Sequence, residues 1–367
     1  MNIPIVRLTV QHAPLKKELM AAVERVLDHG QFVFGEEVTA FEQQFAELCG
    51  VRHALGVNSG TDALILALRA AGIGPGDAVI NPPNSFITSA ASIALVGATP
   101  VFVDVRDDYN INPELIAAAI TPQTKAIMPV HLTGRPAAMD AIMEIAAAHK
   151  LAVIEDCAQA VTASYQGKTV GSIGLCGCFS LHPLKTLNAC GDGGVLTTND
   201  TTVYEKCLAM RNNGLANREE CAVWSGNSRL DTMQAAMLLV KMQHLAAWTS
   251  QRIANARYYQ AQLAQIPNVQ LPVDGPGENA VYHTFIIQAE NRDALQAYLQ
   301  DRGIGTRIHY PIPIHQQQAA AQLQCRNGDF PNTERQAGRI LSLPVYPELT
   351  REEQDYIVDC IRQFYEN

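Results

Sequence analysis

Long hydrophobic runs are missing from this sequence. Its least polar stretch, Ser89–Val105, is interrupted by Gly97 and Pro100 and carries Asp104. No segment reaches the roughly 18 uninterrupted apolar residues that a membrane-spanning helix needs. The first residues, MNIPIVRLTVQ, also lack the basic-then-apolar order of a secretory signal. We therefore expect a cytoplasmic protein with no membrane partner.

A run of basic residues is missing as well. Lys and Arg together number 27 against 36 Asp and Glu, which gives a formal net charge of −9 at pH 7. Nucleic acids and anionic membrane surfaces attract basic patches, so neither is an expected partner. Acidic small molecules remain possible ligands, because a few local groups can bind an anion against the mean field.

The nine cysteines follow no metal-binding or disulfide pattern. They are scattered from Cys49 to Cys360, and only Cys176 and Cys178 lie close together. Their C-x-C spacing has no second pair to complete a zinc site. We expect mostly reduced, mostly buried thiols and no bound metal.

The length and composition that are present indicate a globular protein of two domains. Of the 367 residues, 47% are hydrophobic and 17% are charged. A single core usually stops growing near about 250–300 residues, so two unequal domains are expected. We place a large domain at 1–245 and a small one at 246–367, with the boundary set to within about fifteen residues. The N-terminal helices are expected to pack on either of the two domains.

Short apolar segments alternate with helical patterns through the first half. We predict helices at 14–29, 37–49, 61–71, 87–96, 113–120 and 136–149, and strands at 78–81, 101–105, 125–130 and 151–154. After residue 230 we predict a long helix over 231–264, a loop at 267–279, a strand at 281–288, a helix at 293–302 and a closing helix from residue 350. Short apolar strands separated by helices indicate an α/β fold with a mostly parallel, covered sheet.

The first chemical signal is NSGTDA at 58–63, a small glycine-containing turn that leads into a helix. Backbone N–H groups at a helix start bind anions, and the hydroxyls of Ser59 and Thr61 add donors. The alternative is that one of these hydroxyls only caps the helix.

The second signal is IEDCAQ at 154–159, where carboxylates end a buried strand. Ligands of open α/β sheets bind at that edge, and an acid such as Asp156 can pair there with a protonated ring nitrogen. The alternative is a solvated acid at the end of a strand.

The third signal is SLHPLK at 180–185, followed by GDGG at 191–194. A lysine in a partly apolar pocket has a lowered ammonium pKa and can form a Schiff base with an aldehyde. The alternatives are an exposed loop lysine at position 185 and a glycine-rich turn that serves only a hairpin.

Together the three signals supply the parts that pyridoxal phosphate needs, namely a phosphate cradle, a partner for the ring nitrogen and an amine for the aldehyde. A dinucleotide oxidoreductase is a poor alternative. Its best support, GIGPG at 72–76, lacks the G-x-G-x-x-G spacing, and it follows a helix and precedes a strand.

With these motifs in order, the sequence resembles the DegT/DnrJ/EryC/StrS-type sugar aminotransferases, pyridoxal-phosphate enzymes of the aspartate-aminotransferase-like fold (fold type I). The resemblance covers nearly the whole chain. Its motifs are SGTDAL at 59–64, GIGPGD at 72–77, VGATPVFVDV at 96–105, PVHLTG at 129–134, IEDCAQA at 154–160, SLHPLKTL at 180–187, GDGG at 191–194, RNNG at 211–214, NSRLD at 227–231, IHYPIP at 308–313 and LSLPVYP at 341–347. It implies a large domain with a mostly parallel sheet of the seven-stranded type and a smaller C-terminal α+β domain.

The resemblance also implies roles around the cofactor ring. Lys185 would bind the cofactor aldehyde and shuttle protons. Asp156 would pair with the pyridine nitrogen, and Gln159 would hydrogen-bond the phenolic oxygen. Phe86 would stack on the ring. The alternatives are core packing for Phe86 and a backbone contact for Gln159.

At the phosphate end, the resemblance assigns Gly60, Thr61 and Ser180 to the same subunit. It assigns Asn227 to the neighbouring subunit, which implies a homodimer with shared active sites.

The substrate would contact His182, Arg229, His309 and Tyr310. His182 stands where relatives often carry Tyr or Phe. The alternative for His182 is core packing, and the alternative for Tyr310 is a backbone hydrogen bond. Arg229 could instead form a structural link between subunits. Asp192 stands where many relatives have Glu, and the Asp form is commoner among enzymes that place nitrogen at C3 of a dTDP- or UDP-linked hexose.

The implied reaction moves an amino group from L-glutamate to a keto sugar in amino-sugar biosynthesis, with pyridoxamine 5'-phosphate as the intermediate form of the cofactor. The expected acceptor is a nucleotide-linked 3-keto hexose. A 4-keto nucleotide sugar, a nucleotide-free keto sugar acid and a non-catalytic regulatory protein on the same fold are the alternatives. Dehydratases of the family carry His in place of the lysine, so Lys185 favours transamination.

Overall fold

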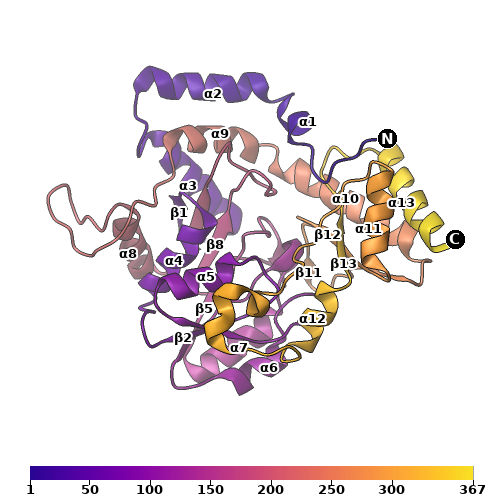
Figure 1. Ribbon diagram of the computed structural model, residues 1–367. Coiled ribbons are helices and arrows are strands. Elements are labelled where there is room, and N and C mark those ends of the chain that lie inside the picture. Colours follow the sequence, from indigo (N-terminus) through magenta and orange to yellow (C-terminus); the bar gives the residue numbers. More distant parts are fainter. Residues whose placement is uncertain (367) are drawn as a thin grey trace.

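The structure is a computed structural model that describes residues 1–366 (Figure 1). Its main helices are α1 (Leu8–His12), α2 (Lys16–His29), α3 (Glu36–Cys49), α4 (Gly60–Ala70), α5 (Thr88–Leu95), α6 (Pro113–Ala119), α7 (Met139–His149), α8 (Thr201–Arg211), α9 (Thr232–Met242), α10 (Leu245–Leu263), α11 (Arg292–Asp301), α12 (Pro331–Ala337) and α13 (Arg351–Glu366). Its strands are β1 (His53–Val57), β2 (Ala78–Asn81), β3 (Thr99–Phe102), β4 (Thr124–Ile127), β5 (Ala152–Asp156), β6 (Ser164–Tyr165), β7 (Lys168–Thr169), β8 (Cys176–Ser180), β9 (Gly194–Thr198), β10 (Val269–Gln270), β11 (Glu278–Asn279), β12 (Phe285–Ala289) and β13 (Ile340–Leu343).

A seven-stranded sheet in the order β1-β9-β8-β5-β4-β2-β3 forms the centre of the molecule. The pairs β8–β5, β5–β4, β4–β2 and β2–β3 are parallel, whereas β9 runs antiparallel to both of its neighbours. Because β5 and β8 are parallel neighbours, their carboxyl ends lie side by side. The sheet therefore brings Asp156, the last residue of β5, next to Ser180, the last residue of β8.

Helices cover both faces of this sheet, which explains why its strands are apolar on both sides. Cys178 and Leu196 point into the core beneath α4, α5 and α8. The next residues along the same strands, Phe179 and Val195, pack instead against α3 and α9. This alternation with a period of two residues buries β8 and β9 on both faces.

A second core lies in the C-terminal part of the chain. The antiparallel sheet β10-β12-β13 packs with α10, α11 and α13 around side chains such as Tyr259 and Phe285. Ile3 is buried in the same core and pairs with Ile304, whereas α2 packs along α9 (Figure 1). The α/β class and the mostly parallel sheet are confirmed, and the domain boundary near residue 245 stays a prediction.

The long, nearly unbroken helical stretch predicted over 231–264 is interrupted once, at Gln243 and His244. Two helices occupy the segment, because the amides of Gln243 and His244 bond to carbonyls three residues back instead of four and close α9. The strand predicted at 281–288 starts later, at Phe285.

The described cysteines are all free thiols, and six of the nine are buried. In residues 1–366 no helix is long and apolar enough to cross a membrane.

Asp104 connects the central sheet to the C-terminal part. Its buried carboxylate follows β3 and accepts hydrogen bonds from the amides of Asn332 and Thr333 and from the Thr333 hydroxyl, at 2.8–3.0 Å. These amides belong to the first turn of α12, so Asp104 caps that helix from a distant part of the chain.

We expect Asp104→Ala to lower the free energy of unfolding by about 3 kcal/mol, because buried donors lose a charged acceptor. Urea denaturation followed by circular dichroism measures this change. The control is Asp107→Ala, which removes a surface ion pair with Arg335 on the same helix and should cost less than about 1 kcal/mol. Equal losses in the two variants would contradict the assignment.

Candidate active site

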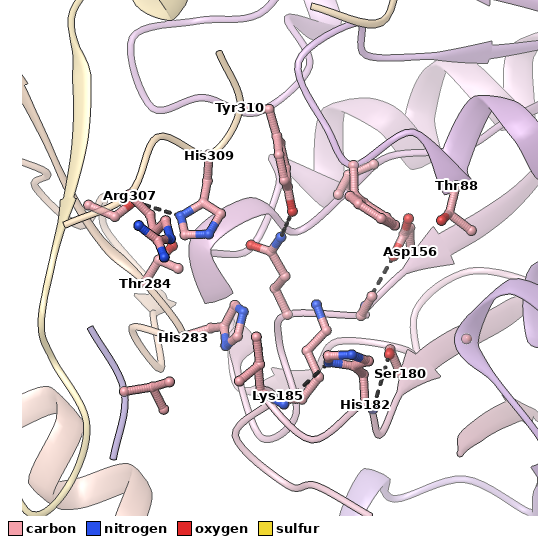
Figure 2. A pocket seen from close by; sticks show the side chains of 18 of the residues that line it. Thr88, Asp156, Ser180, His182, Lys185, His283, Thr284, Arg307, His309 and Tyr310 are labelled. Carbon is pink, nitrogen blue, oxygen red and sulfur yellow. Dashed lines mark hydrogen bonds between the residues drawn. The ribbon is translucent and has the colours of Figure 1, made fainter. Parts of the chain in front are cut away.

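A cavity of about 590 Å³ opens at the carboxyl edge of the central sheet (Figure 2). Residues from the start of α4, the ends of β5 and β8, and the C-terminal part line it. The lining includes Ile5, Val6, Ser59, Gly60, Thr61, Phe86, Thr88, Asp156, Gln159, Ser180, His182, Lys185, Asp192, Arg252, His283, Thr284, Arg307, His309 and Tyr310.

One end of the cavity has free backbone donors. Ser59 caps α4, because its hydroxyl accepts a hydrogen bond from the amide of Asp62 at 3.1 Å. Within residues 1–366 the amides of Gly60 and Thr61 donate no hydrogen bond, and the Ser180 hydroxyl lies beside them. A Cβ atom on Gly60 would lie 2.8 Å from the Cβ of Ser180, so glycine lets the helix start approach β8. In this turn, Ser59 therefore caps α4, while Gly60 and Thr61 supply the free amides of the anion cradle.

Asp156 faces the middle of the cavity from the end of β5. Its Oδ1 accepts a hydrogen bond from the amide of Ala158 at 3.1 Å. Burial raises the pKa of this carboxyl above its ordinary value, while the Ala158 bond and the charges of Lys185 and His131 act in the opposite direction.

The neighbouring acid, Glu155, has a structural role. Its carboxylate is fully buried and accepts hydrogen bonds from the amides of Gly171, Ile173 and Gly174 at 2.7–2.9 Å. His131 adds a fourth contact at 3.0 Å. Its Nδ1 accepts a hydrogen bond from the amide of Ala137, so Nε2 carries the proton and donates to Glu155. Glu155 therefore fixes the loop that precedes β8 and leaves Asp156 to face the cavity.

Lys185 lies in a turn after β8, where its amide donates to the carbonyl of His182 at 2.8 Å. The residue as a whole is half-buried, but its amine is enclosed, and in the described part of the chain Nζ donates no hydrogen bond. Burial lowers the pKa of Lys185 to about 8, and the charge of Asp156 limits the shift. A substantial fraction of this amine is neutral, and thus nucleophilic, slightly above neutral pH.

A buried polar cluster holds the turn that carries Lys185. Asn188 donates to the carbonyl of Lys185 at 3.1 Å and to Gln11 at 3.2 Å. Lys241, which is fully buried, donates to the backbone carbonyl and side chain of Asn188 at 2.9 and 2.8 Å. Sequence reasoning missed Asn188 and Lys241, although a lysine on the buried side of an apolar helix was an available signal.

Gln159 and Tyr310 connect the two parts of the molecule across the cavity. Gln159 accepts from the amide of Thr133 at 2.7 Å and donates to the Tyr310 hydroxyl at 3.3 Å. The Phe86 ring lies 5.6 Å from the Tyr310 ring and is 54% exposed, so it is not a core residue. These side chains line the same cavity as Asp156.

Two predicted substrate residues also line the cavity. His182 is exposed and not packed in the core, and its Nδ1 accepts from the amide of Leu184. His309 is held by Ser342 at 2.8 Å, and burial, with Lys185 and Arg307 nearby, lowers its pKa to about 4.

Asn227 and Arg229 do not line the cavity of their own chain. Asn227 forms a bridge with Asn212, and Arg229 donates to the Asn212 side chain at 3.1 Å and lies over the ring of Phe34. Their predicted roles stay predictions.

The sequence model of the DegT/DnrJ/EryC1/StrS aminotransferase family matches residues 14–362. The chain belongs to this family. The predicted fold type I architecture and the pyridoxal-phosphate-dependent aminotransferase activity are confirmed on that ground.

Similar proteins cover almost the full length. The chain is 46% identical to the UDP-N-acetyl-3-dehydro-alpha-D-glucosamine 3-aminotransferase of Acidithiobacillus ferrooxidans, over 98% of this chain and 97% of that one. It is 44% identical to a pleiotropic regulatory protein of Geobacillus stearothermophilus, over 100% and 99% of the two chains. The solved structure of S. venezuelae DesV in complex with a ketimine intermediate superposes with a TM-score of 0.98 at 42% identity, over 100% and 99%.

The cavity fits the cofactor that the family uses. Free amides at Gly60 and Thr61 suit a phosphate, the buried Asp156 carboxylate suits a protonated ring nitrogen, and the Lys185 amine has no protein partner in residues 1–366. These three features lie on the edge where parallel strands end.

The low pKa of Lys185 predicts a pH dependence of cofactor binding. Only the neutral amine attacks an aldehyde, so the rate at which cofactor-free protein takes up pyridoxal phosphate should rise through about pH 8 and level off above it. Stopped-flow absorbance between pH 6 and pH 9.5 measures the rate. A rate that shows no levelling up to pH 9.5, as the ordinary pKa of 10.5 would give, would contradict the enclosed amine.

Proposed function

We propose that this protein transfers the amino group of L-glutamate to C3 of a nucleotide-linked 3-keto hexose. The observation that carries the proposal is the enclosed amine of Lys185 facing the buried carboxylate of Asp156, beside the free amides at the start of α4. This arrangement combines a proton carrier, a charge partner and an anion cradle in one cavity.

Each residue has a defined task in this proposal. Bound pyridoxal phosphate supplies an electron sink that stabilises negative charge on the α-carbon of the amino donor. Asp156 keeps the ring nitrogen protonated, and Gly60, Thr61 and Ser180 hold the phosphate. The neutral Lys185 amine would take the proton from the α-carbon of the donor and would deliver it to the carbon on the other side of the donor nitrogen, two bonds away.

The position of amination is supported by two observations. Asp192 lines the cavity, and an Asp at this place is the form commoner among enzymes that aminate C3. The relative from Acidithiobacillus ferrooxidans is named for a UDP-linked sugar and a 3-amino product. We infer a UDP- or dTDP-linked acceptor, in amino-sugar synthesis for a surface polysaccharide or a glycosylated metabolite. Nucleotide-linked sugar substrates and nine free thiols both agree with a cytoplasmic location.

The acceptor is tested with a panel of C3-keto and C4-keto sugars linked to dTDP, UDP or GDP, together with a nucleotide-free keto sugar acid. The enzyme in its pyridoxamine 5'-phosphate form is mixed with each sugar, and loss of the absorbance of that cofactor form is followed. We expect reaction with the nucleotide-linked C3-keto sugars. Reaction with C4-keto sugars alone would overturn the proposed position.

Lys185→Arg should lower turnover by at least about 10³-fold, because arginine stays protonated and cannot carry the proton. Full-length holoenzyme and a coupled assay for 2-oxoglutarate measure the loss. The exposed Lys168→Arg is the control and should keep wild-type turnover. Retained turnover in Lys185→Arg would remove the catalytic role assigned to Lys185.

We further propose a homodimer in which Asn227 completes the phosphate site of the partner. The loop after α8 projects away from the rest of the molecule (Figure 1). Large apolar side chains are exposed on α2, on the segment that follows it and on the loop after α8: Met20, Leu27, Phe32, Val33, Phe34, Val223 and Trp224, the last 90% exposed. Such a set of apolar groups is typical of a surface covered in an oligomer.

Complementation between two inactive variants tests the shared site. Lys185→Ala and Asn227→Asp should each be inactive alone, because the second places a negative charge beside the phosphate. Co-expressed chains should recover about a quarter of wild-type activity, since half of random dimers carry one intact site. No recovery in a mixture shown to contain hybrid dimers would contradict the trans contact.

A further inference from the structure

The part of the cavity formed by the C-terminal segments is rich in basic groups. The basic residues that line the cavity are His182, Lys185, Arg252, His283, Arg307 and His309, whereas its only acidic lining residues in the described chain are Asp156 and Asp192. Figure 2 shows His283, Thr284, Arg307 and His309 gathered on one side, across from Asp156. This basic side is distinct from the phosphate cradle at α4.

Arg252 is the buried member of this group. It lies on α10 and is 5% exposed. In residues 1–366 its guanidinium donates one hydrogen bond, from Nη1 to the carbonyl of His283 at 3.3 Å, and Nε has no partner. Burial lowers the pKa of Arg252 to about 10, with the charge of Glu348 opposing the shift, so the group stays cationic at pH 7.

No carboxylate among the described residues forms an ion pair with Arg252. Glu348 acts on it only from beyond contact distance, and burial raises the pKa of Glu348 itself. A buried cation without an ion-pair partner and with incomplete hydrogen bonding is costly, and such groups are normally paired or bind a ligand.

Two polar atoms of the same wall also have no partner within residues 1–366. They are Nδ1 of His283 and Oγ1 of Thr284, both shielded from water. Burial and the nearby cations Lys185 and Arg252 lower the pKa of His283 well below its usual value, so its ring is neutral and can donate one hydrogen bond. Arg252 is therefore the charged group of this wall that can bind an anion, with the neutral His283 ring and Thr284 beside it.

We propose that Arg252 and Thr284, with Arg307 at the rim, form a carboxylate subsite for the amino donor and its 2-oxo acid product. A guanidinium binds a carboxylate through two parallel hydrogen bonds, and the low local dielectric strengthens the pair. Lys185 lines the same cavity as Arg252, Thr284 and Arg307, and Figure 2 shows its side chain on the cavity side of His283.

The donor is the expected source of the carboxylate, because the proposed hexose acceptor has none on its ring. L-glutamate and 2-oxoglutarate each carry two carboxylates, one for the buried Arg252 and one for the exposed Arg307. A sugar acid offers the same chemistry from the acceptor side. The inference rests on the proposed transamination, but carboxylate binding can be measured without it.

The test is calorimetric titration of the holoenzyme with glutarate, a dicarboxylate that has neither an amine nor a keto group. We expect Arg252→Lys and Arg252→Met to weaken glutarate binding by more than about tenfold. Arg307→Gln should weaken it by about two- to fivefold, because that side chain is exposed. The control Arg257→Met removes an exposed arginine of the same helix and should change the Kd by less than about twofold.

A second arm replaces glutarate with D-glucuronate, and the visible absorbance of each variant checks that it still holds the cofactor. If the Arg252 variants lose glutarate binding but keep glucuronate binding, the donor assignment is supported. Loss of glucuronate binding with intact glutarate binding, or unchanged Kd values in folded Arg252→Lys, would overturn it. If glutarate binding depends on Arg252 while no keto sugar is aminated, the proposed function fails and the subsite stands.

Discussion

The enclosure of the Lys185 amine opposite the Asp156 carboxylate is the constraint on which the rest of the site depends. An ammonium and a carboxylate in water would keep their ordinary charges. In the cavity, burial lowers the pKa of Lys185 to about 8 and raises that of Asp156. The parallel pairing of β5 with β8 creates this juxtaposition, because Asp156 ends β5, Lys185 follows β8, and the two strands end at the same edge.

Buried polar groups outside the cavity keep this geometry in place. Glu155 binds three amides and His131 behind β5, and Lys241 binds Asn188 beneath the turn of Lys185. Each group is hydrogen-bonded, so its desolvation is compensated. Arg252 differs, since its bonding is incomplete within the described residues. In the proposed carboxylate subsite, that difference separates a structural charge from one placed to receive a ligand. Such a local cation would let a chain of net charge −9 bind an anion.

Much of the fold and the centre of the site could be predicted from the sequence. The alternation of short apolar strands and helices predicts the parallel sheet, and three motifs predict Gly60, Asp156 and Lys185 as cavity residues. The break between α9 and α10 was missed, because Gln243 and His244 are acceptable in a helix and only local hydrogen bonding ends it. Arg252, His283 and Asn188 were missed for another reason. Their surroundings come from segments far apart in the chain, so no local pattern marks them.

The attachment point of the cofactor tests the central claim most directly. The chain contains two buried lysine amines, at Lys185 and Lys241, and only the first lines the cavity. Reduction of the holoenzyme with borohydride, followed by proteolysis and mass spectrometry, identifies the lysine that carries the cofactor. The account predicts the reduced cofactor on the peptide that contains Lys185 and an unmodified Lys241. A modified Lys241, or a cofactor released intact after reduction, would contradict it.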